Sequence, residues 1–164
     1  AFLYIRLLGK EGLERVSTHA CLNANYLKHI FKKKGLPLAF PERMASHEFL
    51  LSFQKIAKQY DVTAMDIAKR LLDYDMHAPT TYFPLGVPEC FLIEPTETES
   101  KAACDQFVSA LVKIMDEIKS NPERVKMAPH TLPVGRLDDV KAARELRLVW
   151  KKNTEIEKDF ECLT

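Results

Sequence analysis

The sequence predicts an α+β domain in which a small mixed or antiparallel sheet is backed by helices on one face. Three features predict this class: long segments with apolar residues at every third or fourth position, short apolar runs of strand length, and helix-capping patterns between them. They occur in the order helix, strand, helix, strand, strand, helix. At 164 residues the chain is long enough for one ordinary core.

The first predicted element is a long amphipathic helix. From Leu13 to Ile30 the apolar residues recur at steps of three and four, which is the period of a helix that buries one stripe. Three lysines at 32–34 suit the negative end of the helix dipole, and Gly35 follows where a left-handed cap costs least. We therefore expect the helix to end at Gly35.

The chain starts with Ala1 at the head of a segment that already has helical spacing, with Phe2, Ile5 and Leu8 on one side. This pattern indicates a chain that begins part-way through an element. A truncated protein is therefore expected.

A strand and a second helix follow. The segment 47–53 alternates apolar side chains in the manner of a strand. Thr63 and Asp66 form a Thr-x-x-Asp pattern that resembles a capping box, ahead of a buried stripe in 64–72. Asp66 and Arg70 are four residues apart, which predicts an exposed ion pair on this helix.

The middle of the chain predicts a hairpin and a third helix. The runs 80–85 and 90–94 are joined by four residues, a connection short enough for antiparallel pairing. Thr96 and Glu99 repeat the capping signature before a helical stripe that extends to Ile118. Asn121 and Pro122 then predict the start of a short helix, and a last helix is expected within 138–144.

Composition excludes some classes of partner. With 24 basic and 23 acidic residues the net charge is +1, so neither nucleic acid nor an anionic membrane is expected to bind. No apolar run approaches the roughly 20 residues of a membrane span. The cysteines, Cys21, Cys90, Cys104 and Cys162, form no CxxC pair, which predicts no zinc site, no disulfide framework and a reducing, cytoplasmic setting.

Residue types alone do not disclose a reaction. His130 lies in an irregular segment, where a histidine either faces a site or stands on the surface. Glu94, Glu97 and Glu99 are either acid-base groups or, the interpretation we favour, acidic residues that complement a first helical turn. The first three cysteines lie on predicted apolar faces, which favours small buried side chains over nucleophiles.

Four stretches resemble a known family. They are Leu7–Gly9 with Leu22–Leu27, Asp66–Tyr74 with Ala78–Thr80, Ile93–Ser100, and Ala128–Thr131. Together they resemble the C-terminal region of glycine decarboxylase P-proteins, and the likeness extends to about Trp150. The ending around Lys141–Arg144 and Trp150 is more similar to the second subunit of the two-subunit bacterial form.

The resemblance implies the small C-terminal domain of a fold type I pyridoxal-phosphate-dependent transferase. It implies a linking helix from a large domain at 1–35, the small α+β domain at 36–150 and a charged tail at 151–164. The family decarboxylates glycine and passes the aminomethyl group to the lipoyl arm of H-protein, with pyridoxal 5'-phosphate as cofactor and a second P-protein subunit as partner. The cofactor lysine and the phosphate loop are expected upstream of Ala1, so this chain alone should be inactive and hold no catalytic residue and no metal.

Within that resemblance His130, Thr131, Thr80 and Glu97 are the residues expected to line the substrate or cofactor cleft. Two alternatives stay open. The chain could be the small domain of another fold type I enzyme, or a non-catalytic module that docks on a larger subunit. Surface uncovered by the absence of a large domain is expected to make the isolated chain self-associate.

Overall fold

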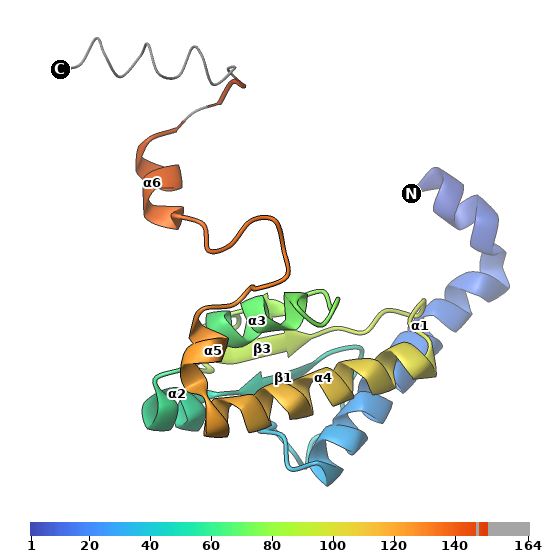
Figure 1. Ribbon diagram of the computed structural model, residues 1–164. Coiled ribbons are helices and arrows are strands. Elements are labelled where there is room, and N and C mark those ends of the chain that lie inside the picture. The colour runs from blue at the N-terminus through green and yellow to red at the C-terminus, as the bar shows by residue number, and fades with distance from the viewer. Residues whose placement is uncertain (147, 151–164) are drawn as a thin grey trace.

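The computed structural model describes residues 1–146 and 148–150, and its centre is a three-stranded antiparallel sheet (Figure 1). The strands are β1 (Phe49–Ser52), β2 (Thr80–Thr81) and β3 (Cys90–Ile93), in the order β1-β3-β2. β3 therefore pairs with both neighbours. The antiparallel form of the predicted sheet is confirmed.

Helices supply the second layer. They are α1 (Phe2–Lys33), α2 (Gln54–Tyr60), α3 (Ala64–Leu72), α4 (Lys101–Ser120), α5 (Pro122–Lys126) and α6 (Asp139–Arg144). α1, α3 and α4 contribute most of the buried residues that pack against the sheet. The α+β prediction is confirmed, whereas the predicted tail at 151–164 lies outside the described residues. No helix in the described part is long and apolar enough to cross a bilayer.

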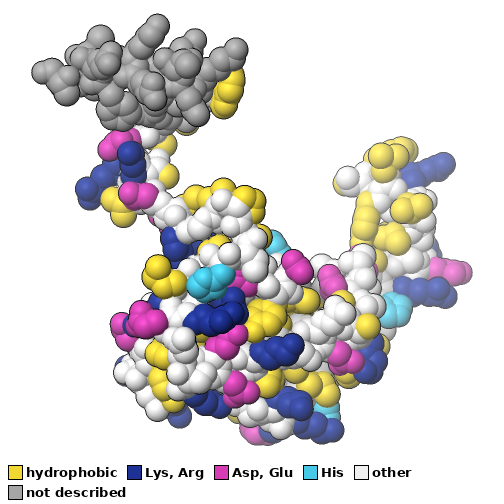
Figure 2. Space-filling model, viewed as in Figure 1, with side chains coloured by type: hydrophobic (Ala, Val, Ile, Leu, Met, Phe, Trp, Pro, Cys, Tyr) yellow, Lys and Arg dark blue, Asp and Glu magenta, His cyan; other side chains and the backbone are white. Residues whose placement is uncertain are grey.

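α1 consists of two helical segments that meet at Gly9. The backbone there has φ 61° and ψ −171°, a conformation that a residue with a side chain adopts only with strain. The helix ends as predicted, because Gly35 has φ 70° in the left-handed region. Residues 2–13, which we name the N-terminal arm, project from the rest of the domain (Figure 1). Hydrophobic side chains gather on the arm (Figure 2), and Leu7 is 85% exposed.

One face of the sheet forms the core. Phe49 and Leu51 of β1 point to the same side as Phe91 and Ile93 of β3, and all four are buried. The rings of Phe53 and Phe91 meet edge to face with centroids 4.8 Å apart, a favourable aromatic geometry. The alternation predicted for 47–53 is thus confirmed.

The opposite face, which we name the open face, is less covered. Its central row contains Leu50, Leu92 and Thr80, which are direct cross-strand neighbours. Leu50 and Leu92 are half-buried and Thr80 is exposed. The sheet therefore has one core face and one face open to a ligand or to another surface.

Two local predictions differ from the structure. α2 was not expected, because its N-cap position is Phe53 and has no side-chain hydrogen bond to mark it. The predicted strand 80–85 is reduced to Thr80–Thr81, because Tyr82 has φ 60° and turns the chain away from β3. The hairpin pairing itself is confirmed.

Of the two predicted helix caps, one is confirmed and the other is wrong. Thr63 and Asp66 form the reciprocal capping box that the sequence predicts. The second signature is wrong: α4 begins after Ser100, whose hydroxyl accepts from the Ala103 N–H at 3.1 Å, and its first turn contains no acidic residue. Asn23 on α1 instead donates to the carbonyls of Thr96 and Glu99, at 2.9 and 3.0 Å, and holds this stretch outside the helix. The predicted dipole role of Glu94, Glu97 and Glu99 is wrong for the same reason.

The corrected cap predicts a contrast between two hydroxyl residues. Ser100→Ala should lower the free energy of unfolding by about 1 kcal/mol, because an N-terminal amide of α4 loses its acceptor. Thr96→Ala should change it by less than about 0.5 kcal/mol, because Thr96 is exposed and caps no helix. Urea unfolding followed by circular dichroism measures both. If Thr96→Ala lowers the free energy of unfolding as much as Ser100→Ala, or more, Thr96 and not Ser100 is the N-cap of α4.

Candidate functional site

A group of buried and half-buried polar side chains joins α3 to α4, and we name Arg70, Asp73, Tyr74 and Glu117 the polar cluster. Arg70 donates from Nε and Nη2 to the two carboxylate oxygens of Glu117, at 2.8 and 2.9 Å, and from Nη1 to Asp73 at 2.7 Å. The Tyr74 hydroxyl donates to Glu117 at 2.8 Å. The side chains of Arg70 and Asp73 are 6% and 1% exposed. The planar guanidinium can satisfy both carboxylates at once.

The polar cluster holds two of the predicted site residues. The backbone N–H groups of His130 and Thr131 donate to Asp73 Oδ1 at 2.6 and 2.8 Å, and the Thr131 hydroxyl donates to it at 2.9 Å. His130 Nε2 lies 2.7 Å from the Arg124 carbonyl, which only accepts, so Nε2 carries the proton. The structure therefore brings His130 and Thr131 together on one buried carboxylate.

Electrostatics match this geometry. Burial alone would raise the pKa of Asp73, but hydrogen bonds from Thr131, Arg70 and His130 outweigh it and lower the pKa to about 2. The hydrogen bond with Arg70 likewise lowers the pKa of Glu117. That same bond raises the pKa of Arg70 above its ordinary value. Arg70, Asp73 and Glu117 are thus ionised at neutral pH, whereas burial raises the pKa of Tyr74 and keeps its hydroxyl neutral.

Acid should weaken the protein through Asp73. Because its pKa in the folded state is about 2, below the ordinary 3.8, the stabilisation is present above pH 4 and is lost as the pH falls toward 2. The expected contribution is about 2 kcal/mol. Unfolding free energies measured between pH 6 and pH 2 should fall by about 2 kcal/mol more in the parent chain than in Asp73→Asn, which keeps the smaller loss through Glu117. Asp116→Asn, which removes an exposed carboxylate, is the control and should keep the loss.

The predicted exposed pair between Asp66 and Arg70 is wrong. Arg70 is buried and binds Asp73 and Glu117. Asp66 accepts instead from Arg136 at 2.7 Å, and Arg136 also donates to the Lys126 carbonyl at 2.8 Å. Arg136 thereby attaches the segment after His130 to α3. Neither Asp73 nor Arg136 was predicted as a site residue, although Asp73 lies within the Asp66–Tyr74 motif.

The other two predicted site residues lie on separate elements. Thr80 is on the open face, opposite Leu92. Glu97 follows β3, and its carboxylate accepts from the Tyr4 hydroxyl of the N-terminal arm at 2.9 Å. Among the described residues no hydrogen bond links Thr80 or Glu97 to His130 or Thr131. The four residues therefore do not form one compact site within this chain.

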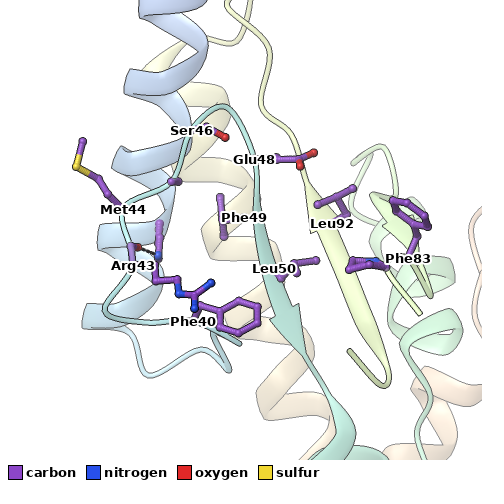
Figure 3. Close-up of a pocket in the computed structure, with 12 residues that line it drawn as sticks. Phe40, Arg43, Met44, Ser46, Glu48, Phe49, Leu50, Phe83 and Leu92 are labelled. Atoms are coloured by element: carbon purple, nitrogen blue, oxygen red, sulfur yellow. Dashed lines mark hydrogen bonds between the residues drawn. The ribbon is translucent and has the colours of Figure 1, made fainter. Parts of the chain in front are cut away.

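A pocket of about 340 Å³ lies at the open face, beside the row that contains Thr80 (Figure 3). Its walls include Phe40 and Arg43 from the segment after α1, Leu50 of β1, Leu92 of β3, and Lys28 of α1. Neither Lys28 nor Arg43 was predicted as a site residue from the sequence. One signal was available, because Lys28 belongs to the same helical stripe as the buried Ala24, Leu27 and Phe31.

The cysteine prediction is confirmed for two residues. Cys90 and Cys104 are buried free thiols, and burial raises the pKa of each. A raised pKa disfavours the thiolate that a nucleophile requires. Cys21 is half-buried.

Comparison with known proteins agrees with the fold. A family profile described as "Glycine dehydrogenase, C-terminal domain" matches residues 16–132. The chain is 60% identical over 151 residues to the "Probable glycine dehydrogenase (decarboxylating) subunit 2" of Thiobacillus denitrificans, an alignment that covers 92% of this chain and 31% of that relative. Proteins of the same name from Nitrosomonas europaea and Coxiella burnetii are each 58% identical, over 92% and 95% of this chain and 31% and 32% of their own lengths.

The chain thus spans about a third of the length of the curated relatives it matches. The profile match covers most of the described domain, from the second segment of α1 to the residues that bind Asp73. The resemblance seen in the motifs around Asp66–Tyr74, Ile93–Ser100 and Ala128–Thr131 is confirmed. This chain belongs to the family of glycine dehydrogenase C-terminal domains.

Proposed function

We propose that the chain is the C-terminal small domain of a decarboxylating glycine dehydrogenase, the P-protein of the glycine cleavage system. The complete enzyme would release carbon dioxide from glycine and transfer the aminomethyl group to the lipoyl arm of H-protein, and another P-protein subunit would complete it. The observation that supports this most is the 58–60% identity to subunit 2 proteins over more than nine tenths of the chain. Its free buried thiols suit a reducing compartment, in keeping with a cytoplasmic location.

The domain would be of the fold type I kind, with residues 1–35 as the link to a large domain and 36–150 as the small domain. Two facts favour a link at α1. The family profile begins at residue 16, so the N-terminal arm lies outside it. The arm also exposes Phe2, Leu3, Ile5 and Leu7, which side chains of a neighbouring domain would bury.

Pyridoxal 5'-phosphate is the cofactor we propose for the complete enzyme, where it would supply the electron sink for decarboxylation. The described residues do not make a site for it by themselves. Gly9 and Gly12 lie within α1, and none of the other three glycines directly precedes a helix, so no glycine-rich loop offers its backbone amides to a phosphate. Lys28, the buried lysine, donates to the carbonyl of Arg43. We therefore assign the cofactor lysine to the part of the relatives that this chain does not cover.

For this chain we propose supporting and lining roles at the cleft. His130 and Thr131 would approach it from the small-domain side, with Asp73 fixing their backbone. Thr80 would contribute from the open face. Glu97, through its bond with Tyr4, would lie where the N-terminal arm meets the domain.

Exchange of labelled bicarbonate into the carboxylate of glycine tests the proposed reaction. It is measured with this chain alone and with the complete enzyme, in both cases with pyridoxal phosphate and lipoylated H-protein. Exchange by the complete enzyme alone is the expected result. Exchange in neither would contradict the proposal and leave another fold type I enzyme or a docking module.

The role of His130 has its own test in the complete enzyme. His130→Ala should lower the exchange rate at least tenfold, roughly the effect of removing a positioned polar group. His29→Ala, which removes an exposed histidine of α1, is the matched control and should leave the rate unchanged. An unchanged rate in His130→Ala would remove His130 from the cleft.

A further inference from the structure

The pocket at the open face combines apolar walls with two basic side chains and one acidic side chain. It is a half-open pocket that is bounded by the segment 40–48 and by β1 and β3 (Figure 3). Its volume of about 340 Å³ falls at the lower end of the range for small-molecule sites, roughly 300–1,000 Å³. Aromatic and aliphatic side chains, among them Phe40, Phe83, Leu50 and Leu92, make most of its walls.

Lys28 contributes a buried positive charge to the pocket wall. The residue is 8% exposed, and lysine is rarely buried to this degree unless it is paired. Its Nζ donates to the Arg43 carbonyl, a neutral acceptor that uses one of the three ammonium protons. Within the described residues no carboxylate lies within 4 Å of this Nζ.

Glu42, the acidic residue whose charge acts on Lys28, is already engaged. Glu42 accepts from Lys32 with both carboxylate oxygens, at 2.8 and 2.9 Å. Burial lowers the pKa of Lys28, while the charge of Glu42 opposes that effect and the charge of Lys32 adds to it. An anion in the pocket would relieve the cost of keeping this ammonium charged away from water.

Arg43 adds a second cation and Glu48 one anion. The guanidinium of Arg43 stacks over the Phe40 ring, 5.1 Å from the centroid. In Figure 3 Arg43 is turned toward Phe40, whereas Glu48 is turned toward Leu92 on the other side. With two positive and one negative side chain the pocket has a net charge of +1. A ligand with one negative charge neutralises this net charge, whereas a dianion would leave the filled pocket with a net negative charge.

We propose that this pocket binds a small organic carboxylate with an apolar body, whose carboxylate meets Lys28 and Arg43 and whose body lies against Phe40, Leu50 and Leu92. The inference concerns binding alone and does not rest on the proposed enzymatic function. Carboxylate ligands suit the site because hydrogen bonds from ammonium and guanidinium groups to a carboxylate are charge-assisted and therefore stronger than hydrogen bonds between neutral groups. Glu48 would then weaken the binding of any ligand that has only negative charge.

Titration of the 164-residue chain with benzoate, followed by NMR, tests the proposal. Saturable shifts of the Lys28 side chain and of the Leu50 and Leu92 methyl groups are expected. Benzyl alcohol, which has the same ring without the charge, should bind about tenfold more weakly. Inorganic phosphate should also bind more weakly than benzoate. No saturation with benzoate, or tighter binding of phosphate, would overturn the assignment.

Variants separate the charges. Lys28→Met keeps the apolar stem and should weaken benzoate binding by about tenfold or more. Lys33→Met, on the same helix but exposed and outside the pocket, is the matched control and should bind as the parent does. Glu48→Gln should tighten binding several-fold by removing a like charge.

Arg43→Gln covers the case in which Lys28→Met fails to fold, because Arg43 is exposed and its loss does not leave a buried charge. Weaker benzoate binding in Arg43→Gln would support the site. Unchanged binding in Arg43→Gln, or in a folded Lys28→Met, would overturn it.

Discussion

Arg70→Ala is expected to lower the free energy of unfolding by about 3–5 kcal/mol, the usual cost of removing one partner from a buried ion pair. The loss is large because Asp73, whose side chain is 1% exposed, and the half-buried Glu117 would remain as neighbouring anions without their cation. A domain of this size has only about 5–15 kcal/mol to lose. Far-UV circular dichroism during urea unfolding at pH 7 measures the change.

Two further variants test the reason for that loss. Arg70→Lys keeps the charge but cannot bind both carboxylates through a planar fork, so an intermediate loss is expected. Lys69→Ala, on the same helix and without an ion pair among the described residues, should change stability by less than about 0.5 kcal/mol. If Arg70→Ala costs no more than Lys69→Ala, the polar cluster does not stabilise the fold.

Phe91→Ala is expected to have a similar effect, about 3–5 kcal/mol, through loss of packing. Phe91 is fully buried in the central strand, and its ring contacts Phe53 edge to face with centroids 4.8 Å apart. Removing the ring leaves a cavity between the sheet and its helices. Urea unfolding should show a lower midpoint with an unchanged slope, since the change affects stability and not the surface exposed.

The neighbouring residue on the same strand is the matched control. Leu92 points to the open face and is half-buried, so Leu92→Ala should cost clearly less than Phe91→Ala. The pair therefore tests which face of β3 is the core. If Leu92→Ala lowered the free energy of unfolding more than Phe91→Ala, the core would lie on the other face of β3.

Local patterns predicted most of the elements, because the forces behind them act within a few residues. The stripe from Leu13 to Ile30 predicted α1, and alternation in 47–53 predicted β1. The capping box of Thr63 and Asp66 was predictable for the same reason, since both partners belong to one helical turn.

Where two local patterns compete, the sequence does not decide between them. Thr96 and Ser100 both precede a helical stripe with a suitable residue for a cap. Ser100 is the N-cap because Asn23, which is distant in the sequence, donates hydrogen bonds to the carbonyls of Thr96 and Glu99. A contact between elements outweighs a pattern within one of them.

By itself the sequence determined the α+β class, the family resemblance and the order of the main helices and strands. Only the tertiary structure decided which polar residues become partners: Arg70 with Glu117, Asp73 with His130 and Thr131, and Lys28 with the pocket at the open face. The physical reason is range. Helical and strand periods express neighbours within about four residues, whereas the burial of a charge and the identity of its partner depend on which distant elements pack together.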